Sequence, residues 1–430
     1  MNKYWLETYG CQMNKAESDS LEIILKKRGW EPSTRDEDAD LVIINTCSVR
    51  KTAEDRIWGR IGYFRRLKKS SDFKLVIIGC MAERIKEELL REGKGTVDYV
   101  LGTFEKNNIL EYLESIPEKN SSDRYVFQEY HSDGSSFKAF VPIMHGCNNF
   151  CSYCIVPYVR GREISRDAEA IINEIRFLDE KGVKEVTFLG QNVNSYRGLY
   201  KGKEIDFATL LRLTCENISS IGWIRFMSSH PKDFGSELID TIAAYPQICS
   251  HIHLPVQHGS DRILELMNRR YTSGRYMEII SEIKEKIPGV SLTTDILIGF
   301  PGEKEEDWSA TMDLMEKVRY SDAYTYYYNP REGTKACTMP DSVPHDIKLA
   351  RLDKIISLQH RISGELKESR VGSIRRVLVE SVSKKNENEL LARTEGDDMV
   401  VFAEKCDKIG SFMDVRIVSA MGNTLKGEVV

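Results

Sequence analysis

The amino-terminal part of the chain alternates short apolar runs with longer amphipathic segments. Residues 4–9, 41–45 and 75–78 have the composition of strands, and the last two are apolar on both faces. That pattern is typical of buried parallel strands. Between them, residues 16–28 and 53–69 repeat apolar positions with the period of a helix. This order predicts an α/β domain with a flavodoxin-like parallel sheet and helices on its faces.

The middle of the chain repeats the same alternation on a larger scale. Apolar segments there predict six strands, and the intervals leave room for one helix per crossover. The segments are residues 139–144, 185–189, 224–228, 250–256, 291–298 and 323–328. Six strand–helix units, rather than eight, predict a partial (β/α)6 barrel of TIM type with a wide mouth. Chemistry in such barrels lies at the carboxyl ends of the strands.

The carboxyl-terminal part changes character to short strands separated by Gly and Asn/Asp turns. The expected strands are residues 377–382, 390–393, 400–402 and 415–419. They predict a small antiparallel β-barrel. A polar stretch, residues 118–134, is the expected linker between the first two parts. We therefore expect three domains, at residues 1–120, 137–365 and 370–430.

Composition narrows the class of protein. The chain has 430 residues, 41% of them hydrophobic, which excludes a disordered or collagen-like protein. Its 61 basic and 66 acidic residues give a net charge of −5, so any nucleic-acid site must be a local patch. No apolar run approaches the roughly 20 residues that span a bilayer, and residues 1–14 lack the apolar region of a secretory signal. We expect a soluble cytoplasmic protein without a membrane partner.

Three cysteines stand in a Cys-x3-Cys-x2-Cys motif, Cys147, Cys151 and Cys154, directly after the first strand of the expected barrel. Three thiolates in one loop can bind three irons of a [4Fe-4S] cluster. No fourth cysteine lies nearby, so one iron stays open and can bind the amino and carboxylate groups of S-adenosylmethionine (SAM). The alternatives are a zinc site, with His145 as the fourth ligand, and three incidental cysteines.

A second set of three cysteines, Cys11, Cys47 and Cys80, follows three predicted strands of the amino-terminal sheet. The carboxyl ends of parallel strands lie on one edge, where ligands bind. We therefore expect these thiols to converge at a second three-thiolate site. The alternative is that they are ordinary buried cysteines. The other four cysteines, Cys215, Cys249, Cys337 and Cys406, are isolated in sequence and are interpreted as core or surface thiols.

At this point the chain resembles the radical-SAM methylthiotransferase family over nearly its whole length. The Cys-x3-Cys-x2-Cys motif resembles the radical-SAM signature, and the carboxyl-terminal part is similar to the TRAM domain of RNA-modifying enzymes. Residues 9–14, 44–50 and 156–163 resemble the tRNA-modifying branch, whereas the branch that modifies a ribosomal protein usually differs after its first cysteine. Two positions depart from the family pattern, Ser48 and His258, and neither is an expected cluster ligand.

The resemblance implies two [4Fe-4S] clusters and SAM as cofactors, and it marks residues around them. Tyr153 takes the place of an aromatic side chain against the adenine of SAM, and Asp295 to Gly299 lead into a turn that frames it. The full set of expected cofactor contacts is Tyr153, Gly190, Gln191, Asn192, Ser229, Asp295, Gly299 and Arg331. For Gly190 to Asn192 the alternative is an ordinary turn, and for Arg331 it is a structural ion pair.

Four arginines are the candidate tRNA contacts. Arg160 and Arg162 stand close to the cluster loop, where a substrate would enter the barrel. Arg65 and Arg66 belong to a basic and aromatic segment that can pair phosphates and stack unpaired bases. For that segment the alternative is a solvated helix face.

The resemblance also implies the reaction. It is the addition of a methylthio group to carbon 2 of N6-isopentenyl-adenosine next to the anticodon, so the expected partner is the anticodon stem-loop of tRNA. We also expect a low-potential electron donor such as flavodoxin or ferredoxin, an unidentified sulfur donor, and a monomer. One alternative is the same chemistry on threonylcarbamoyl-adenosine tRNA or on an aspartate of a ribosomal protein. A remote alternative is a non-catalytic iron–sulfur or zinc module that binds RNA.

Overall fold

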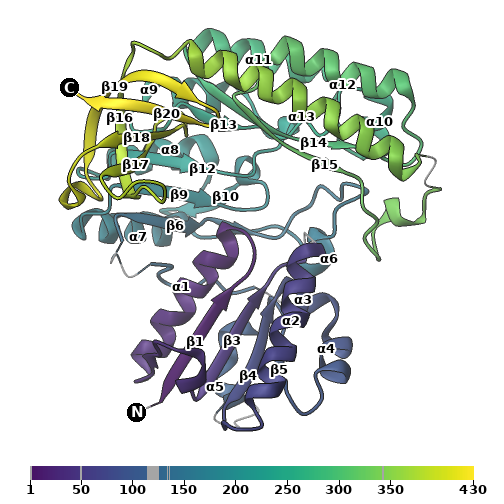
Figure 1. Ribbon diagram of the computed structural model, residues 1–430, viewed down its shortest axis with the longest axis vertical. Coiled ribbons are helices and arrows are strands. Elements are labelled where there is room, and N and C mark those ends of the chain that lie inside the picture. Colours follow the sequence, from purple (N-terminus) through teal and green to yellow (C-terminus); the bar gives the residue numbers. More distant parts are fainter. Residues whose placement is uncertain (1, 49–50, 114–124, 133, 135, 341–342) are drawn as a thin grey trace.

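The computed structural model describes residues 2–48, 51–113, 125–132, 134, 136–340 and 343–430. Of residues 51–53 and 107 it describes the backbone alone. Residues 118–124 and 133 of the expected linker lie outside the described residues. Figure 1 shows the amino-terminal sheet below a larger barrel, with the carboxyl-terminal strands beside that barrel and away from the amino-terminal sheet.

The amino-terminal sheet is parallel throughout and has the strand order β2-β1-β3-β4-β5. That order confirms the flavodoxin-like prediction. The strands are β1 (Lys3–Thr8), β2 (Glu31–Pro32), β3 (Leu41–Thr46), β4 (Lys74–Gly79) and β5 (Tyr99–Leu101). The helices are α1 (Gln12–Lys27), α2 (Lys51–Leu67), α3 (Cys80–Arg84), α4 (Lys86–Glu92) and α5 (Ile109–Leu113), with single turns η1 (Asp36–Asp38) and η2 (Lys106–Asn108).

Both faces of this sheet are buried, as the apolar strands predict. On one face, Val42 and Ile44 of β3 join a core cluster with residues of α2, and on the other, Leu41 and Ile43 join a cluster with residues of α1 and α5. Helix α1 begins at Gln12, four residues before the expected start. Its first turn departs from the amphipathic pattern because Asn14 is hydrogen-bonded to the strand ends and Met13 packs against Leu189 of the barrel.

The middle of the chain forms two parallel three-stranded sheets, β12-β9-β6 and β13-β14-β15. A bridge between Ile224 and Ile248 joins them, so six strands form one partial barrel. The strands are β6 (Lys138–Pro142), β9 (Glu185–Leu189), β12 (Trp223–Phe226), β13 (His251–His253), β14 (Ser291–Ile298) and β15 (Asp322–Tyr327). The prediction of six strands is confirmed. The third strand ends at Phe226, before Ser228, whose φ of 69° is incompatible with a strand.

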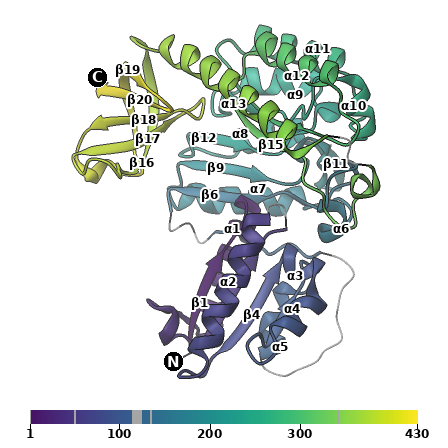
Figure 2. The same ribbon diagram turned by 45° about the vertical axis from the view of Figure 1, so that its right-hand side comes forward.

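Helices cover the outside of the partial barrel (Figure 2). They are α7 (Ala168–Glu180), α8 (Phe207–Glu216), α9 (Ser236–Ala244), α10 (Asp261–Leu266), α11 (Ser273–Lys286), α12 (Glu305–Val318) and α13 (His345–Glu368). Smaller elements are β7 (Met144–His145), α6 (Val156–Arg160), β8 (Ile164–Ser165), η3 (Val193–Ser195), β10 (Arg197–Tyr200), β11 (Lys203–Asp206), η4 (Pro231–Asp233) and η5 (Lys335–Thr338). Within the described residues, no helix combines the length and apolar character needed to cross a membrane.

The carboxyl-terminal strands close into a barrel in the order β16-β17-β18-β20-β19. They are β16 (Ile374–Val382), β17 (Glu389–Thr394), β18 (Met399–Ala403), β19 (Phe412–Met421) and β20 (Thr424–Val429), with a single turn η6 (Cys406–Lys408). The expectation of an antiparallel barrel needs correction, because β18 and β20 pair in parallel. This barrel docks on the amino ends of the larger barrel's strands, where Arg225 of β12 donates to the carbonyl oxygens of Thr394 and Glu395.

A cavity lined by two sets of three cysteines

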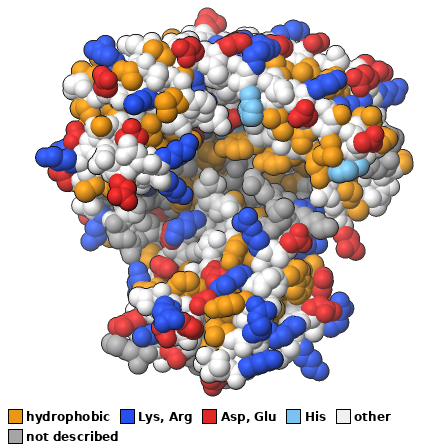
Figure 3. Space-filling view, in the orientation of Figure 1, with side chains coloured by type: hydrophobic (Ala, Val, Ile, Leu, Met, Phe, Trp, Pro, Cys, Tyr) orange, Lys and Arg blue, Asp and Glu red, His pale blue; other side chains and the backbone are white. Residues whose placement is uncertain are grey.

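A cavity of about 380 Å³ lies between the amino-terminal sheet and the partial barrel. Its lining includes all six cysteines of the two expected sets: Cys11, Cys47, Cys80, Cys147, Cys151 and Cys154. The space-filling view shows a hollow between the upper and lower parts of the molecule, with hydrophobic side chains gathered in it (Figure 3). The carboxyl ends of both parallel sheets face this space, which explains why residues from two domains meet there.

The first set comes from three adjacent strand ends. Cys11 follows β1 and precedes α1, Cys47 follows β3, and Cys80 begins α3 directly after β4. Cys47 and Cys80 are buried, whereas Cys11 is exposed. Burial raises the pKa of the Cys80 thiol above its ordinary value. The structure thus brings these three cysteines to one cavity, and their binding of a cluster stays a prediction.

Two glycines let the backbone turn tightly beside these thiols. Gly10 has a φ of 149°, and a Cβ there would lie 2.6 Å from Asn14 Oδ1. Gly79 has a φ of 97°, and its Cβ would lie 2.5 Å from the Thr46 carbonyl oxygen. Asn14 Nδ2 also ties the strand ends together, because it donates to Asn45 Oδ1 at 2.9 Å and to Thr46 O at 3.0 Å.

The second set lies in the loop between β7 and α6. The Cys154 N–H donates to the Cys151 carbonyl oxygen at 2.9 Å, which folds the last part of the motif into a turn. Gly146 precedes the motif with a φ of 78°, and a Cβ there would lie 2.1 Å from the Arg162 carbonyl oxygen. Burial raises the pKa of Cys147 to about 11 and that of Cys154 to about 12.

The donor set fits the clusters that the sequence predicts. Thiolates, and not thiols, bind metal, so thiols whose pKa is raised by burial need a positive partner that stabilises their ionised form. Irons supply that partner. No three His, Cys, Asp or Glu side chains of the described residues lie close enough to hold a single metal ion. In a cluster each thiolate binds a different iron, which allows a wider spacing.

Several expected cofactor contacts line this cavity. They are Tyr153, Gly190, Gln191, Ser229 and Asp295. Two of them carry buried oxygens without a hydrogen-bond partner among the described residues, Gln191 Oε1 and Ser229 Oγ. Such atoms are normally satisfied in a folded protein, so they fit the polar groups of a bound ligand. Asn192 does not line the cavity; its Nδ2 donates to Asp233 Oδ2 at 2.7 Å, while its Oδ1 is also buried without a hydrogen-bond partner among the described residues.

A second cavity of about 540 Å³ shares Tyr153, Cys154 and Asp295 with the first. Its other walls include Tyr326 and Arg331. Arg331 Nη1 lies 3.8 Å from Glu54 Oε1 of the amino-terminal domain, so the structure favours the ion pair that the sequence offers as its alternative role.

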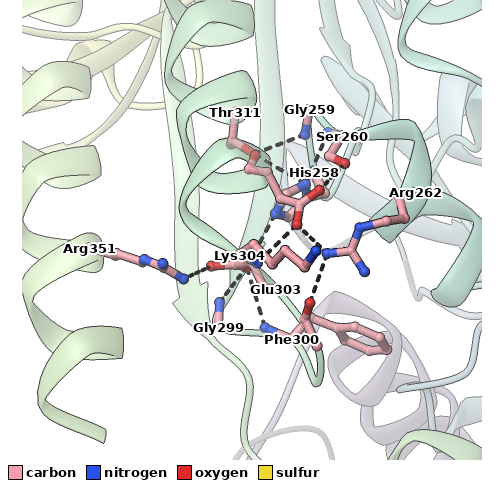
Figure 4. A network of polar contacts seen from close by, with 12 residues as sticks. His258, Gly259, Ser260, Arg262, Gly299, Phe300, Glu303, Lys304, Thr311 and Arg351 are labelled. Atoms are coloured by element: carbon pink, nitrogen blue, oxygen red, sulfur yellow. Dashed lines mark hydrogen bonds and ion pairs between the residues drawn. The ribbon is translucent and has the colours of Figure 1, made fainter. Parts of the chain in front are cut away.

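Gly299 does not line either cavity and belongs instead to a turn supported by a polar network (Figure 4). The Gly299 N–H donates to Glu303 Oε2 at 2.6 Å. Arg351 Nη1 donates to the other carboxylate oxygen of Glu303 at 2.7 Å. His258 Nδ1 accepts the Ser260 N–H at 3.0 Å, which leaves Nε2, 3.2 Å from Glu303 Oε2, as the protonated ring nitrogen. His258, which departs from the family pattern, therefore has a structural role: it hydrogen-bonds to Glu303 and Ser260 in this network.

Arg160 does not have the position expected of a tRNA contact. It is buried, and its Nη1 donates to Glu17 Oε1 of α1 at 2.8 Å. This ion pair joins the partial barrel to the amino-terminal domain and leaves the guanidinium no access to a phosphate outside. Arg162, in contrast, is exposed beside the cluster loop and lies over the Phe150 ring at 4.3 Å.

Arg65 and Arg66 lie at the far end of the amino-terminal domain from the cysteines. They end α2, which runs from the carboxyl edge of the sheet back to its amino edge. Both side chains are exposed, and Arg65 Nε donates to Thr96 Oγ1 at 3.2 Å. Neither side chain lines the cavity, so contact of these two arginines with tRNA stays a prediction, and it would lie away from the cysteines.

Arg269 is a prominent residue of the site that no pattern in the sequence indicates. Its side chain is buried, with Nη1 3.4 Å from Cys151 Sγ, and Nη2 donates to the Pro255 carbonyl oxygen at 2.7 Å. Arg269 thus connects the cluster loop to the segment after β13. No regular spacing relates residue 269 to the cysteine motif, so only the folded structure reveals the contact.

We expect Arg269→Met to destabilise the apoprotein by about 1–3 kcal/mol, because the buried Pro255 carbonyl loses its short, charge-assisted hydrogen bond and keeps only the Tyr271 hydroxyl at 3.4 Å. Thermal or urea unfolding measures this change. The matched control is Arg270→Met at the neighbouring position, which is exposed, and it should leave stability within about 0.5 kcal/mol of the parent. Equal effects of the two substitutions would contradict the role that we give to Arg269.

Comparison with protein families supports the division seen in the fold. Residues 141–315 match the radical SAM superfamily, residues 3–102 match a family described as the uncharacterized protein family UPF0004, and residues 368–430 match the TRAM domain. Among solved structures, the radical SAM methyltransferase TsrM from Kitasatospora setae is similar, with a TM-score of 0.58 and 14% identity over 78% of this chain and 77% of that one. At that identity the likeness shows the fold alone.

Curated relatives align over nearly the whole chain. A protein of Treponema denticola is 46% identical over 99% of this chain and 99% of its own length, and one of Dictyoglomus thermophilum is 44% identical over 100% and 99%. A protein of Bacteroides fragilis is 44% identical over 100% of this chain and 96% of its own. All three are named tRNA-2-methylthio-N(6)-dimethylallyladenosine synthase. With this identity and coverage, and with the cysteines at the ends of two parallel sheets, the chain belongs to the family of the tRNA-2-methylthio-N(6)-dimethylallyladenosine synthases, which are radical SAM enzymes.

Proposed function

We propose that this protein adds a methylthio group to carbon 2 of N6-isopentenyl-adenosine next to the anticodon of tRNA. The observation that carries the proposal is that both sets of three cysteines line one cavity. When bound, SAM and the two [4Fe-4S] clusters supply the radical, the sulfur and the methyl group. The names of the full-length relatives support the choice of this base over threonylcarbamoyl-adenosine or a ribosomal-protein aspartate.

The chain's own residues hold and separate the cofactors. Cys147, Cys151 and Cys154 would hold the cluster that binds SAM, and the set from the amino-terminal domain would hold the auxiliary cluster. Gln191 Oε1 and Ser229 Oγ, which are buried without partners among the described residues, fit the polar groups of SAM. Tyr153 lies in the walls of both cavities and provides an aromatic surface for its adenine.

The enclosed position of the cavity serves the chemistry in two ways. Apolar walls from both domains exclude water, which protects a reactive radical and strengthens the electrostatic interactions inside. A base of the anticodon loop is already unpaired, so it can turn into such a pocket at small cost in energy. Arg162, exposed beside the cluster loop, is placed to bind a phosphate of the entering strand.

The remaining parts of the proposal concern the whole chain. We assign residues 1–120 to the auxiliary-cluster domain, 137–365 to the radical SAM barrel and 370–430 to a TRAM domain that contributes to tRNA binding. The protein works as a cytoplasmic monomer and receives electrons from a low-potential donor such as flavodoxin or ferredoxin. The sulfur donor is not specified by any described residue.

The test is a reaction of the anaerobically reconstituted protein with three substrates. These are tRNA carrying N6-isopentenyl-adenosine, tRNA carrying threonylcarbamoyl-adenosine, and ribosomal protein. We expect the methylthio mass on the first substrate alone, detected by mass spectrometry of nucleosides and peptides. A product on either of the others would move the assignment to that substrate. A protein that binds tRNA but holds no iron and forms no 5′-deoxyadenosine would be the non-catalytic module.

A further inference from the structure

Three buried charged side chains meet beneath the amino-terminal set of cysteines. Glu17 of α1, Lys106 of η2 and Arg160 of α6 come from two domains and are 6%, 3% and 3% exposed. Glu17 Oε1 lies 2.5 Å from Lys106 Nζ and 2.8 Å from Arg160 Nη1. We call these three residues the interdomain triad.

The interdomain triad contains two cations and only one carboxylate. The nearby Tyr125 adds no negative charge, since burial raises the pKa of its hydroxyl far above the ordinary value, and the neighbouring His145 ring cannot be anionic. These two rings stack at a centroid distance of 3.6 Å. Within the described part of the chain, Lys106 Nζ contacts the Glu17 carboxylate and the face of the Tyr125 ring, 5.1 Å from its centroid, and has no further anionic partner; burial lowers its pKa. The triad therefore leaves an excess positive charge and spare N–H donors in a buried place.

The excess charge lies next to the auxiliary set of cysteines. Arg160 lines the same cavity as Cys11 and Cys80. Val159, the preceding residue, packs with Cys80 in one buried cluster, and its carbonyl oxygen accepts the Thr103 hydroxyl at 2.7 Å. Burial opposes the charge of Arg160, but Cys80 and then Glu17 hold its pKa above the ordinary value. Arg160 is thus placed to offset negative charge that develops at the Cys80 sulfur when it binds a metal.

A buried net charge is costly unless a counter-charge compensates it. An iron–sulfur cluster with three thiolate ligands is anionic, and an anionic sulfur ligand on its open iron makes it more so. The reduction potential of such a cluster depends on its net charge and on nearby donors. We infer that the interdomain triad is the counter-charge site of the auxiliary cluster, where Lys106 and Arg160 stabilise the reduced cluster and an anionic sulfur species bound to it.

This inference rests on the proposed function, because it takes Cys11, Cys47 and Cys80 to hold a cluster. The experiment is a redox titration of the reconstituted full-length chain, followed by electron paramagnetic resonance. Lys106→Met keeps the length of the side chain and removes its charge. We expect the ratio of reduced to oxidised auxiliary cluster to fall about tenfold at a given potential, which is about 59 mV for one electron. The potential of the SAM-binding cluster should not change.

The matched control is Lys86→Met in the same domain. Lys86 also pairs with a carboxylate, Glu105 at 2.7 Å, but its side chain is 43% exposed. Lys106→Arg should restore the parent potential because it restores the charge. To assign the signals, each variant is repeated in a chain whose Cys147, Cys151 and Cys154 are replaced by alanine, so that only the auxiliary cluster contributes.

Unfolding of the apoprotein supplies a second readout. Lys106→Met leaves a neutral pair of Glu17 and Arg160, so the apoprotein should be at least as stable as the parent. An unchanged auxiliary potential, or an equal shift of both clusters, would overturn the inference, and so would a destabilised apoprotein with an unchanged potential. A parent chain that holds no auxiliary iron would instead contradict the proposed function.

Discussion

A chain with Cys47→Ala is expected to cleave SAM but to form no detectable methylthio product. Cys47 is buried in the amino-terminal domain, whereas the cysteines of the SAM-binding set lie in a loop of the barrel. Since separate domains carry the two sets, removing one ligand should empty one cluster site only. Iron should fall from about eight to about four atoms per chain. Iron analysis, chromatography of 5′-deoxyadenosine and mass spectrometry of tRNA measure the three quantities.

Two further variants make that result specific. Cys151→Ala should abolish formation of 5′-deoxyadenosine while about four irons remain. Cys337→Ala, at an exposed cysteine outside the cavity, should keep all the iron and full activity. If Cys47→Ala kept methylthio transfer, or if it lost SAM cleavage together with all iron, the assignment of two independent three-cysteine sites would be wrong.

The fold was predictable where burial on both faces leaves a clear pattern. Residues 41–46 are buried throughout, and the unbroken apolar run at residues 41–44 indicates a central parallel strand. Strand β20 was missed because Leu425 and Gly427 are its only buried residues. Its parallel pairing with β18 depends on how the barrel closes, and no local pattern encodes such a long-range closure.

The cysteines could be found because topology alone brings strand ends together. The roles of the arginines could not be predicted, because a basic side chain beside a site can pair with either a phosphate or a buried carboxylate. For Arg160 the choice is made by Glu17, which is 143 positions away in the sequence. Arg269 likewise reaches Cys151 across 118 positions. The first contact forms only when the amino-terminal domain meets the barrel, and the second only when distant loops of the barrel pack together.

Gly79→Ala is expected to destabilise the amino-terminal domain by about 3 kcal/mol or more and to remove the auxiliary cluster. Gly79 has φ 97° and ψ −159°, a conformation that other residues occupy only at a cost of about 1–3 kcal/mol. The added Cβ would also lie 2.5 Å from the Thr46 carbonyl oxygen and 2.6 Å from Asn45 Oδ1. The backbone must shift to relieve these contacts, and the shift displaces Cys80, the next residue.

Two other glycines in the same domain provide control substitutions that should raise the stability of the domain instead of lowering it. Gly59 and Gly62 lie within α2, and a Cβ at either would meet nothing within 4 Å. Gly59→Ala or Gly62→Ala should therefore stabilise the domain by about 0.5–1 kcal/mol and keep the iron content of the parent. Urea unfolding of the apoproteins and iron analysis after reconstitution compare the three variants. Loss of iron in all of them, or in none, would contradict the view that Gly79 holds Cys80 at the cavity.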